Sequence, residues 1–155
     1  MRLTKAGDYA MRGLIYLARQ PQGEVVLVSE IAHAMYVPES FLAKIFQSLA
    51  KAGLVRSHRG YGGGYSLNRP PVAITLLEVI ECVEGPIVFN DCTDPNGHLE
   101  GLGEHNCSES CVAQAVWLEA QAAVREILEA KTMEELAAVP AQCEGVSPIT
   151  LSTVK

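Results

Sequence analysis

Apolar side chains recur at helical spacing through the first third of the chain. Between residues 4 and 19 they fall every three or four positions, which predicts an amphipathic helix whose first turn is capped by the Thr4 hydroxyl. A brief second helix is expected over residues 30–35, with Ser29 as its cap. A turn and a longer helix over residues 39–52 should follow. The inward-facing positions of that third helix are apolar: Phe41, Leu42, Ile45, Phe46 and Leu49.

A small β-hairpin is predicted directly after the third helix. Gly53 stands where the end of a helix needs a left-handed residue, a conformation that glycine adopts without steric cost. Short strand-like pieces at residues 54–55 and 65–67 flank a glycine-rich run at residues 59–64. Two helices joined by a tight turn and followed by a hairpin make a winged helix-turn-helix. The third helix would be its recognition helix and the hairpin its wing.

Capping boxes mark two helix starts in the second half of the chain. Thr75 with Glu78 opens a helix that ends near residue 84, and Thr132 with Glu135 opens a short one. Residues 90–106 are rich in Asp, Gly, Asn and Pro and should form a loop. A long helix is then expected over residues 109–131. Its wide apolar strip suits the twin helix of a symmetric dimer and comprises Val112, Val116, Ala120, Ala123 and Ile127, with Trp117, Val124 and Leu128 beside it.

The charges divide between the two halves. The 155 residues carry a net charge of −6, which taken alone argues against DNA binding. Residues 1–70, however, hold nine basic and four acidic residues, a net charge of +5, whereas residues 71–155 have a net charge of −11. A basic half that faces DNA and an acidic half that stays off it would explain this division. Ordinary variation in surface charge is the alternative.

The predicted recognition helix and wing carry residue types that contact DNA. Side chains at the start of a helix in the major groove reach base edges and phosphates. Here they are Pro38, Glu39, Ser40, Lys44 and Gln47. Arg59 at the hairpin tip suits the narrow minor groove, where the negative potential is enhanced. Gly60 and Tyr61 beside it complete the expected DNA-binding set, and double-stranded DNA with a near-palindromic operator is the expected partner.

The glycine-rich run and the winged helix each have one other interpretation. A phosphate-binding loop would need a strand before it and a helix after it, or a Lys-Ser/Thr pair at its end, and the run has neither. Winged helices also serve as protein-interaction modules, and the basic first half is the main argument against that role here. DNA binding is therefore favoured.

Three cysteines gather between the two late helices. Cys92, Cys107 and Cys111 lie in or beside the predicted loop, and Cys111 falls in the first turn of the predicted long helix, which favours a thiolate. Three soft ligands suit an iron–sulfur cluster or zinc, and His98 and His105 could complete a zinc site. Three free thiols are the alternative. Cys82 falls within an apolar helix and is expected in the core, and Cys143 is assigned no role.

Four segments resemble the bacterial iron–sulfur regulators that include IscR, NsrR and RirA. They are residues 3–10 (LTKAGDYA), residues 52–55 (AGLV), residues 59–65 (RGYGGGY) and residues 75–80 (TLLEVI). The resemblance extends to the cysteine-bearing loop before a long helix and so covers most of the chain. It implies a homodimeric transcription factor in which each subunit holds one cluster near the partner's DNA-binding domain.

The resemblance also implies a ligand set. Cys92, Cys107 and Cys111 would hold the cluster, and Asp8 from the partner subunit would complete the set, as in NsrR-type members. Arg12, one turn after Asp8, could hold that carboxylate in place. Other members use a histidine or glutamate, so His33 and His105 are rivals for the fourth position. The family spaces its cysteines about six residues apart, whereas fourteen residues separate the first two here and three separate the last two. Both a 4Fe–4S and a 2Fe–2S cluster stay open.

The sequence thus predicts a mainly helical protein with a small hairpin. Residues 1–72 would form the winged helix-turn-helix domain, residues 73–140 the cluster-binding loop and dimerisation helices, and residues 141–155 a flexible tail. The chain has no export leader and no apolar run long enough to cross a membrane, so a cytoplasmic location is expected. It also shows no catalytic motif, so an enzyme is not expected.

The expected function follows from these parts. We expect a homodimeric repressor that senses nitric oxide, oxidants or iron–sulfur status through a labile cluster. The alternative is the same DNA-binding fold with zinc or free redox-active thiols in place of the cluster.

Overall fold

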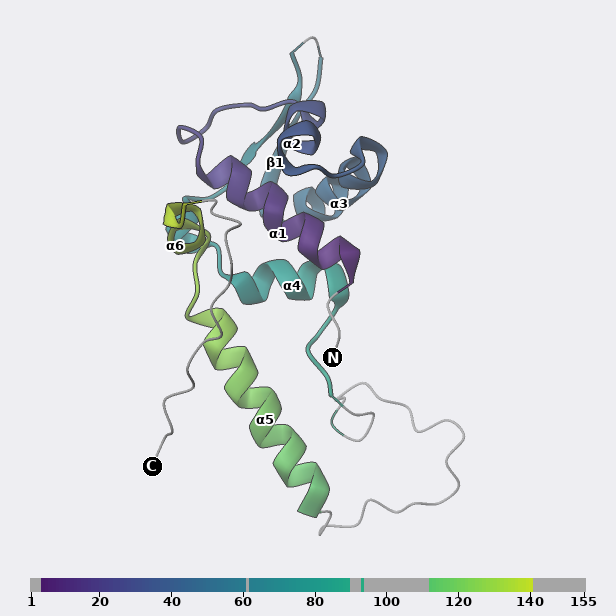
Figure 1. The fold of residues 1–155 in the computed structure, drawn as a ribbon, viewed down its shortest axis with the longest axis vertical. Helices are drawn as coiled ribbons and strands as arrows, with labels where there is room; N and C mark the ends of the chain where they lie inside the picture. The colour runs from purple at the N-terminus through teal and green to yellow at the C-terminus, as the bar shows by residue number, and fades with distance from the viewer. Residues whose placement is uncertain (1–3, 61, 90–92, 94–111, 141–155) are drawn as a thin grey trace.

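The computed structural model in Figure 1 describes residues 4–60, 62–89, 93 and 112–140. Its elements in chain order are α1 (Lys5–Ala18), α2 (Val28–Met35), α3 (Glu39–Lys51), β1 (Val55–His58), β2 (Gly64–Leu67), the 3-10 helix η1 (Pro71–Ala73), α4 (Leu76–Glu84), α5 (Val112–Glu129) and α6 (Met133–Ala138). The strands β1 and β2 pair antiparallel in a two-stranded sheet. The described part is therefore mainly helical with a small hairpin, as the sequence predicts.

Short polar side chains start three of the helices. The Thr4 hydroxyl accepts a hydrogen bond from the Ala6 backbone N–H at 3.1 Å and caps α1. The Thr75 hydroxyl accepts from the Glu78 backbone at 3.2 Å, and Glu78 accepts in return from the Thr75 backbone at 3.0 Å. The Thr132 hydroxyl accepts from the Glu135 backbone N–H at 3.3 Å and caps α6. These three of the four predicted caps are confirmed, because each satisfies backbone donors that a first helical turn leaves free.

The start of α2 differs from the prediction. The helix begins at Val28 with Leu27 as its N-cap residue, so Ser29 lies inside the first turn and does not cap it. The cause lies in the neighbouring hairpin. Val26 pairs with Tyr65 of β2 through two backbone hydrogen bonds of 2.8 and 2.9 Å. This pairing holds the chain extended up to Val26, and the helix starts as soon as the chain leaves the sheet edge.

One apolar core joins most of the elements. It buries side chains of α1, α2, α3, β1, α4 and α6 together with residues between them: Ala10, Leu14, Leu17, Val26, Ile31, Ala32, Val37, Leu42, Ile45, Phe46, Leu49, Leu54, Val55, Ile74, Val79 and Met133. Four of the five residues predicted to face inward from α3 belong to it. Phe41 does not, since its side chain is 44% exposed. It lies at the edge of the core, where its ring packs edge-on against the ring of Tyr9 on α1, with centroids 5.9 Å apart.

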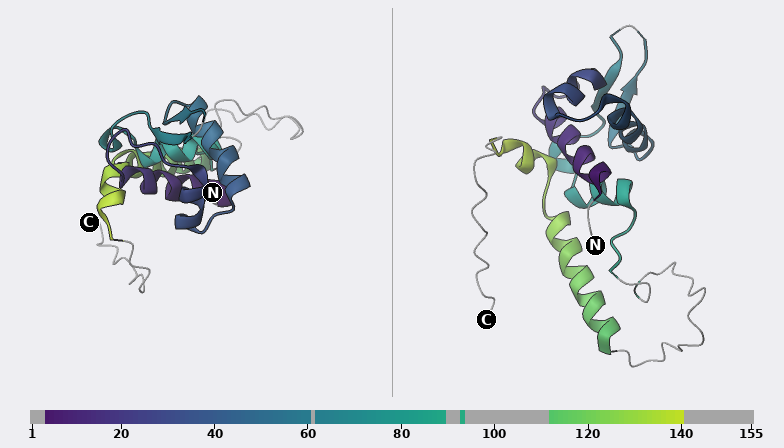
Figure 2. Two further views of the ribbon diagram at one scale, coloured as in Figure 1. Left: turned by 90° about the horizontal axis from the view of Figure 1, so that it is seen from above. Right: turned by 45° about the vertical axis from the view of Figure 1, so that its right-hand side comes forward.

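A smaller apolar cluster attaches α5 to α4. Leu77 and Ile80 of α4 and the following Ile87 are buried there, with Val124 and Leu128 of α5 packed against them. An ion pair between Glu81 and Arg125 adds to this contact. Only the C-terminal part of α5 is attached in this way. The rest projects away from the other helices, as both side views show (Figures 1 and 2). None of the described helices is long and apolar enough to span a membrane.

Candidate DNA-binding surface and sensor region

The outer face of α3 is polar and open to solvent. Pro38 is the N-cap residue, and the side chains of Glu39, Ser40, Lys44 and Gln47 are all exposed. The spacing between residues 40, 44 and 47 is four and three, so these three side chains share one face of the helix. The buried face of the same helix belongs to the core, which fixes α3 in place. The structure thus leaves all five residues predicted for the recognition helix exposed and places three of them on one face.

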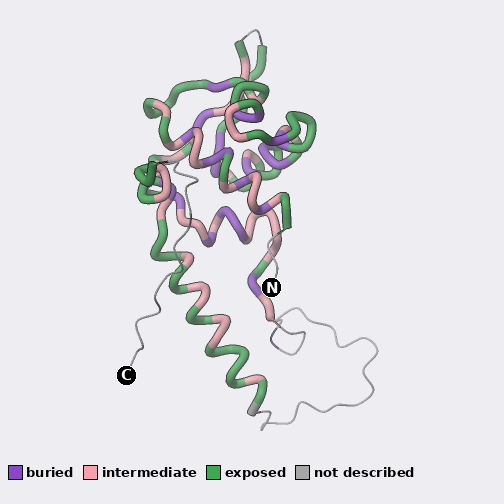
Figure 3. The backbone as a smooth tube through the Cα atoms, in the orientation of Figure 1, coloured by how far each residue is buried: buried purple, intermediate pink, exposed green. Residues whose placement is uncertain are grey.

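The hairpin places Arg59 at its tip. Four residue pairs, from Val55 with Leu67 to His58 with Gly64, connect β1 and β2. Beyond the last pair, Arg59 and Gly60 are exposed, and a turn closes with a hydrogen bond of 2.9 Å from the Gly63 N–H to the Gly60 carbonyl. Figure 3 shows the described residues next to the hairpin tip as exposed, above the rest of the molecule. Tyr61, also predicted to contact DNA, lies outside the described residues.

Two glycines at the hairpin permit a close approach of backbone to backbone. A Cβ atom on Gly64 would lie 2.1 Å from the Val26 carbonyl oxygen, and one on Gly63 would lie 2.5 Å from the His58 carbonyl oxygen. Both distances are shorter than atoms tolerate, so any side chain would push the strands apart. Gly64 is therefore needed to seat the hairpin beside residue 26, and Gly63 to close its turn. The sequence places Gly60 in the predicted DNA-binding set but gives no sign of this internal role of Gly63 and Gly64.

The recognition helix and the wing are held against each other at their base. The ring of Phe46 on α3 meets the ring of Tyr65 on β2 edge-on, with centroids 5.0 Å apart. The left-handed Gly53, with φ of 75°, turns the chain from α3 into β1, and the Leu54 N–H donates to the Leu49 carbonyl at 3.0 Å. The predicted closing role of Gly53 is confirmed. The two elements therefore present a fixed pair of surfaces rather than two separate loops.

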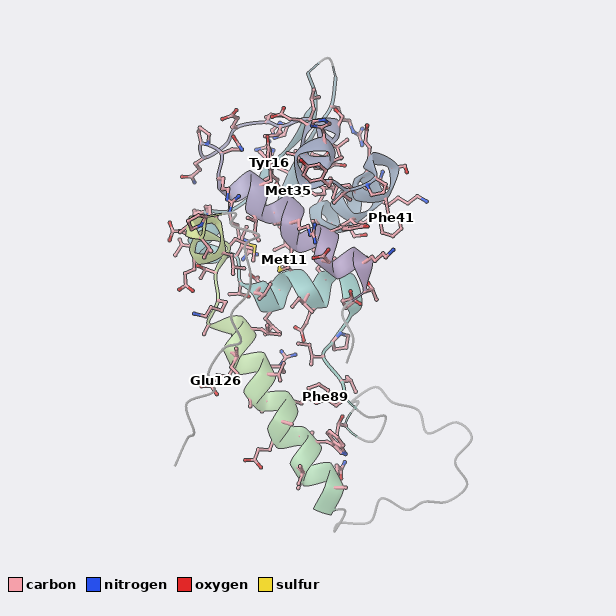
Figure 4. All side chains as sticks on the ribbon, viewed as in Figure 1. Met11, Tyr16, Met35, Phe41, Phe89 and Glu126 are labelled. Atoms are coloured by element: carbon pink, nitrogen blue, oxygen red, sulfur yellow. The ribbon has the colours of Figure 1, made fainter. Side chains whose placement is uncertain are left out.

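Two exposed aromatic side chains near α3 were not predicted as site residues. Phe41, labelled beside α3 in Figure 4, leaves the core although its spacing predicts a buried position. Tyr36, in the turn before α3, is 93% exposed. The sequence carried one signal for Tyr36, because a residue between two predicted helices must adopt a turn conformation. It carried none for the position of Phe41, which lies at the boundary between the inner and outer faces of α3.

The predicted ligand Asp8 lies in the first turns of α1, and Arg12 holds its carboxylate. The Arg12 guanidinium donates to Asp8 at 3.1 Å, and both side chains are partly open to solvent. This contact is the one predicted from their spacing of four. His33, the rival ligand, lies in the last turn of α2 and is exposed. Within the described part of the chain, no three His, Cys, Asp or Glu side chains are grouped so that they could hold a metal ion.

The remaining predicted ligands fall on residues that the structure does not describe. Cys92, Cys107, Cys111, His98 and His105 all lie there. Thr93 is described within this region, and its hydroxyl donates to Gln121 of α5 at 3.2 Å. The structure therefore neither assembles nor separates the predicted ligand set.

Cys82 behaves as a core residue. Its side chain is partly buried against the main core, and its thiol donates to the Ser48 carbonyl at 3.8 Å. Burial raises the pKa of the Cys82 thiol, which disfavours the reactive thiolate. This agrees with the prediction that Cys82 is structural.

Glu84 ties the first turn of α1 to the end of α4. Its Oε1 accepts three hydrogen bonds, from the Thr4 N–H at 3.0 Å, the Thr4 hydroxyl at 2.6 Å and the Gly7 N–H at 3.1 Å. A carboxylate at this place also interacts favourably with the positive end of the helix dipole. Because α4 leads through Gly85 toward Cys92, this contact joins the turn that carries Asp8 to the start of the cysteine-bearing segment. Sequence reasoning missed Glu84, since the contact spans 80 residues.

The outward face of α5 exposes large apolar side chains. Val116 is 57% and Ile127 is 63% exposed, and the small residues Ala120 and Ala123 lie between them along the same strip. Val124 and Leu128, predicted beside the strip, instead turn toward α4. Trp117 meets the ring of Phe89 with centroids 6.3 Å apart. The helix thus uses one apolar side within the chain and leaves a second one open.

Comparison with known proteins gives a consistent result. The profile of the Rrf2 family, described as "Iron-dependent Transcriptional regulator", matches residues 3–139. The HTH-type transcriptional regulator IscR of Vibrio cholerae is 32% identical over 136 residues, which cover 88% of this chain and 75% of that protein. The structure of CymR, titled the global cysteine regulator of B. subtilis, superposes with a TM-score of 0.70 at 31% identity and covers 88% of this chain and 96% of CymR. The structure of T. potens IscR gives a TM-score of 0.68 at 26% identity, with 94% of both chains covered.

Proposed function

The chain belongs to the Rrf2 family of transcriptional regulators, and we propose that it represses transcription by binding a near-palindromic operator in double-stranded DNA as a homodimer. The observation that carries this proposal is the polar face of α3, from Glu39 to Gln47, held beside a hairpin with Arg59 at its tip. A recognition helix of this kind reads the major groove, and a basic wing tip reaches the adjacent minor groove. Residues 1–72 would make these contacts, in the cytoplasm.

The open strip on α5 supports the homodimer. A single chain leaves Val116 and Ile127 in water, and burying them against the same strip of a second copy would remove that cost. A two-fold axis through the paired α5 helices would relate the two recognition helices, and the operator should then have matching half-sites. Residues 73–140 would thus serve as the dimerisation and sensing part.

The DNA contacts can be tested with three alanine variants. Lys44→Ala and Arg59→Ala should each weaken operator binding by about tenfold and lower the slope of log affinity against log salt by about one. Lys131→Ala is the matched control, because it removes the same charge from an exposed side chain outside the winged helix-turn-helix domain. Fluorescence anisotropy over a salt series measures both quantities. An Arg59→Ala variant with unchanged affinity would show that the wing does not contact the operator.

We propose further that DNA binding is controlled through an iron–sulfur cluster. Cys92, Cys107 and Cys111 would hold it, with Asp8 of the partner subunit as the fourth ligand. Thiolates with one carboxylate suit iron, and Asp8 supports the proposal because its carboxylate is both accessible and oriented by Arg12. When bound, a cluster with such a labile ligand supplies reactivity toward nitric oxide and oxidants. His33 and His105 remain rivals for the fourth position, and both 4Fe–4S and 2Fe–2S clusters are compatible with this donor set.

A second candidate mechanism is a thiol or zinc switch on the same fold. It is favoured by the likeness to CymR, the global cysteine regulator of B. subtilis, and by the uneven spacing of the three cysteines. In this mechanism the thiols themselves would change oxidation state or hold zinc with His98 or His105. The DNA-binding surface would be unchanged.

Anaerobic purification separates the two mechanisms. Absorption spectroscopy and native mass spectrometry should show a coloured protein with the mass of a bound cluster. Loss of the colour in Asp8→Ala, with His33→Ala and His105→Ala unaffected, would assign the fourth ligand. A colourless, iron-free protein after anaerobic reconstitution would exclude the cluster and leave zinc or thiols.

A further inference from the structure

Tyr36 has a backbone conformation that its side chain disfavours. Its φ of 56° and ψ of 43° are left-handed, and it is the one residue with positive φ among the described residues other than glycine. In this conformation the Cβ atom crowds the backbone, which is why glycine or asparagine usually ends a helix in this way. The turn itself is well formed, since the Val37 N–H donates to the Ala32 carbonyl at 2.9 Å. A glycine at position 36 would make the same turn without the crowding.

No interaction of the Tyr36 side chain with the described residues offsets this strain. It is 93% exposed, which is more than any other exposed large hydrophobic residue that the structure describes. Among the described residues, its ring meets no other aromatic ring and its hydroxyl has no hydrogen-bond partner. Neither backbone geometry nor packing within the subunit therefore explains a tyrosine at this position, and a contact outside the chain would.

The position of Tyr36 indicates what that contact is. It lies in the turn between α2 and α3, two residues before Pro38, where the recognition helix begins. In a helix-turn-helix the first helix crosses the sugar-phosphate backbone while the recognition helix enters the groove, and Tyr36 is the C-cap residue of that first helix, α2. Tyrosine is one of the side chains that donate to phosphate oxygens, and its ring offers an apolar face to a deoxyribose. The surrounding half of the chain is basic, so this surface attracts DNA rather than an acidic partner.

We infer that Tyr36 is a further DNA-contacting residue, whose hydroxyl donates to a backbone phosphate while its ring packs against the adjoining sugar. This inference rests on the proposed operator binding by α3 and the wing. Because phosphate contacts position a protein without reading bases, Tyr36 sets how deeply α3 sits in the groove. The strained backbone is then retained for binding, in keeping with the tendency of strained residues to gather at functional sites.

The test is a pair of measurements that should move in opposite directions. Tyr36→Gly removes both the crowded Cβ and the ring. The melting temperature should therefore rise, by about 2–4 °C, while operator affinity falls by about tenfold. Tyr36→Phe keeps the ring and loses the hydroxyl, so its affinity should fall by a smaller factor, about threefold, with the melting temperature unchanged. A more stable protein that binds more weakly cannot be explained by damage to the fold.

A matched control removes the remaining ambiguity about chain flexibility. Tyr36→Asn also tolerates the left-handed conformation but is stiffer than glycine. Its affinity should fall as far as that of Tyr36→Gly. Wild-type affinity in both the Gly and Asn variants would overturn the inference. A loss in Gly alone would also overturn it, because flexibility of the turn rather than the ring would then be responsible.

The salt dependence distinguishes this inference from the proposed function itself. Tyrosine is neutral and releases no counterion, so the slope of log affinity against log salt should be the same in wild type and Tyr36→Gly, whereas it should fall in Arg59→Ala. If Arg59→Ala and Lys44→Ala weaken binding and the Tyr36 variants do not, only the role of Tyr36 is wrong. If none of these variants changes binding, the proposed DNA surface is wrong.

Discussion

The two halves of the chain differ in how far they bury their apolar side chains. In residues 4–72 most large apolar side chains enter one core or pack against it, and α3 keeps a polar outer face. In α5, Val124 and Leu128 pack against α4 and Trp117 meets Phe89, while Val116 and Ile127 stay exposed to solvent. The first half buries its apolar core within one subunit and exposes the polar face that is proposed to bind DNA. The second half is incomplete, which indicates that its state depends on assembly.

The halves nevertheless share contacts that can transmit a change. The main core includes Ile74, Val79 and Met133 from the second half. Glu84 at the end of α4 holds the first turn of α1, and Cys82 reaches the backbone of α3 at Ser48. A displacement of α4 would therefore be felt at both α1 and the recognition helix. We therefore expect that dimerisation, operator binding and the contacts between the two halves can each be weakened by a separate substitution.

The largest effect is expected from a charge on the open strip of α5. Ile127→Asp should weaken dimerisation by more than about 100-fold, because pairing would bury an unpaired carboxylate. Sedimentation velocity over a dilution series measures this, and the circular dichroism spectrum should stay that of a folded protein. The matched control is Leu118→Asp, which places the same charge at an exposed leucine on the opposite side of α5. Dimers of equal strength in both variants would mean that α5 pairs by another face.

A side chain at Gly64 should damage the first half while leaving the second intact. The Cβ atom of Gly64→Ala would lie 2.1 Å from the Val26 carbonyl oxygen, so the hairpin must shift. We expect a loss of about 1–3 kcal/mol in the free energy of unfolding, with weaker operator binding and unchanged dimerisation. Chemical denaturation and anisotropy give these values. Ser57→Ala, on the exposed surface of β1, serves as the control and should behave as wild type.

Glu84→Ala should remove the hydrogen bonds that join the end of α4 to the first turn of α1. This change leaves the N–H groups of Thr4 and Gly7 without their carboxylate partner, and the loss of a helix cap costs about 1 kcal/mol. Thermal unfolding measures that cost, and the amide signals of residues 4–8 should shift in an NMR spectrum. Glu119→Ala removes an exposed acid from α5 and is the control. Unchanged amide signals in Glu84→Ala would show that the contact does not form in solution.

The smallest effect concerns acid stability at the junction between the halves. Burial raises the pKa of the Glu78 carboxyl, but hydrogen bonds from Thr75 and Arg69 lower it by more, so it lies below the ordinary value of 4.5. The ionised form is thus favoured in the folded state. Its stabilisation is complete above pH 4.5 and disappears as the pH falls through the lowered value. Melting temperatures between pH 6 and about pH 3 should therefore fall more steeply for wild type than for Glu78→Gln.

The sequence allowed the helices, their threonine caps and the hairpin to be predicted because these depend on residues close together in the chain. Thr75 with Glu78, and Gly53 after α3, are local patterns of this kind. Contacts over long separations were missed. The pairing of Val26 with Tyr65 moved the start of α2, and Glu84 reached Thr4 across 80 residues. The proposed DNA-binding residues could be grouped from the sequence because they share one helix and one turn, whereas the proposed ligand set combines three segments. Both sets stay predictions.

Control of the first half by the second is the central claim, and one measurement tests it directly. Operator sequences selected from a random DNA library would be titrated anaerobically with the dimer, before and after exposure to nitric oxide or removal of iron. We expect the dissociation constants of the two states to differ by at least about tenfold, a typical coupling between distant sites. Equal dissociation constants, with the dimer intact in both states, would contradict this control.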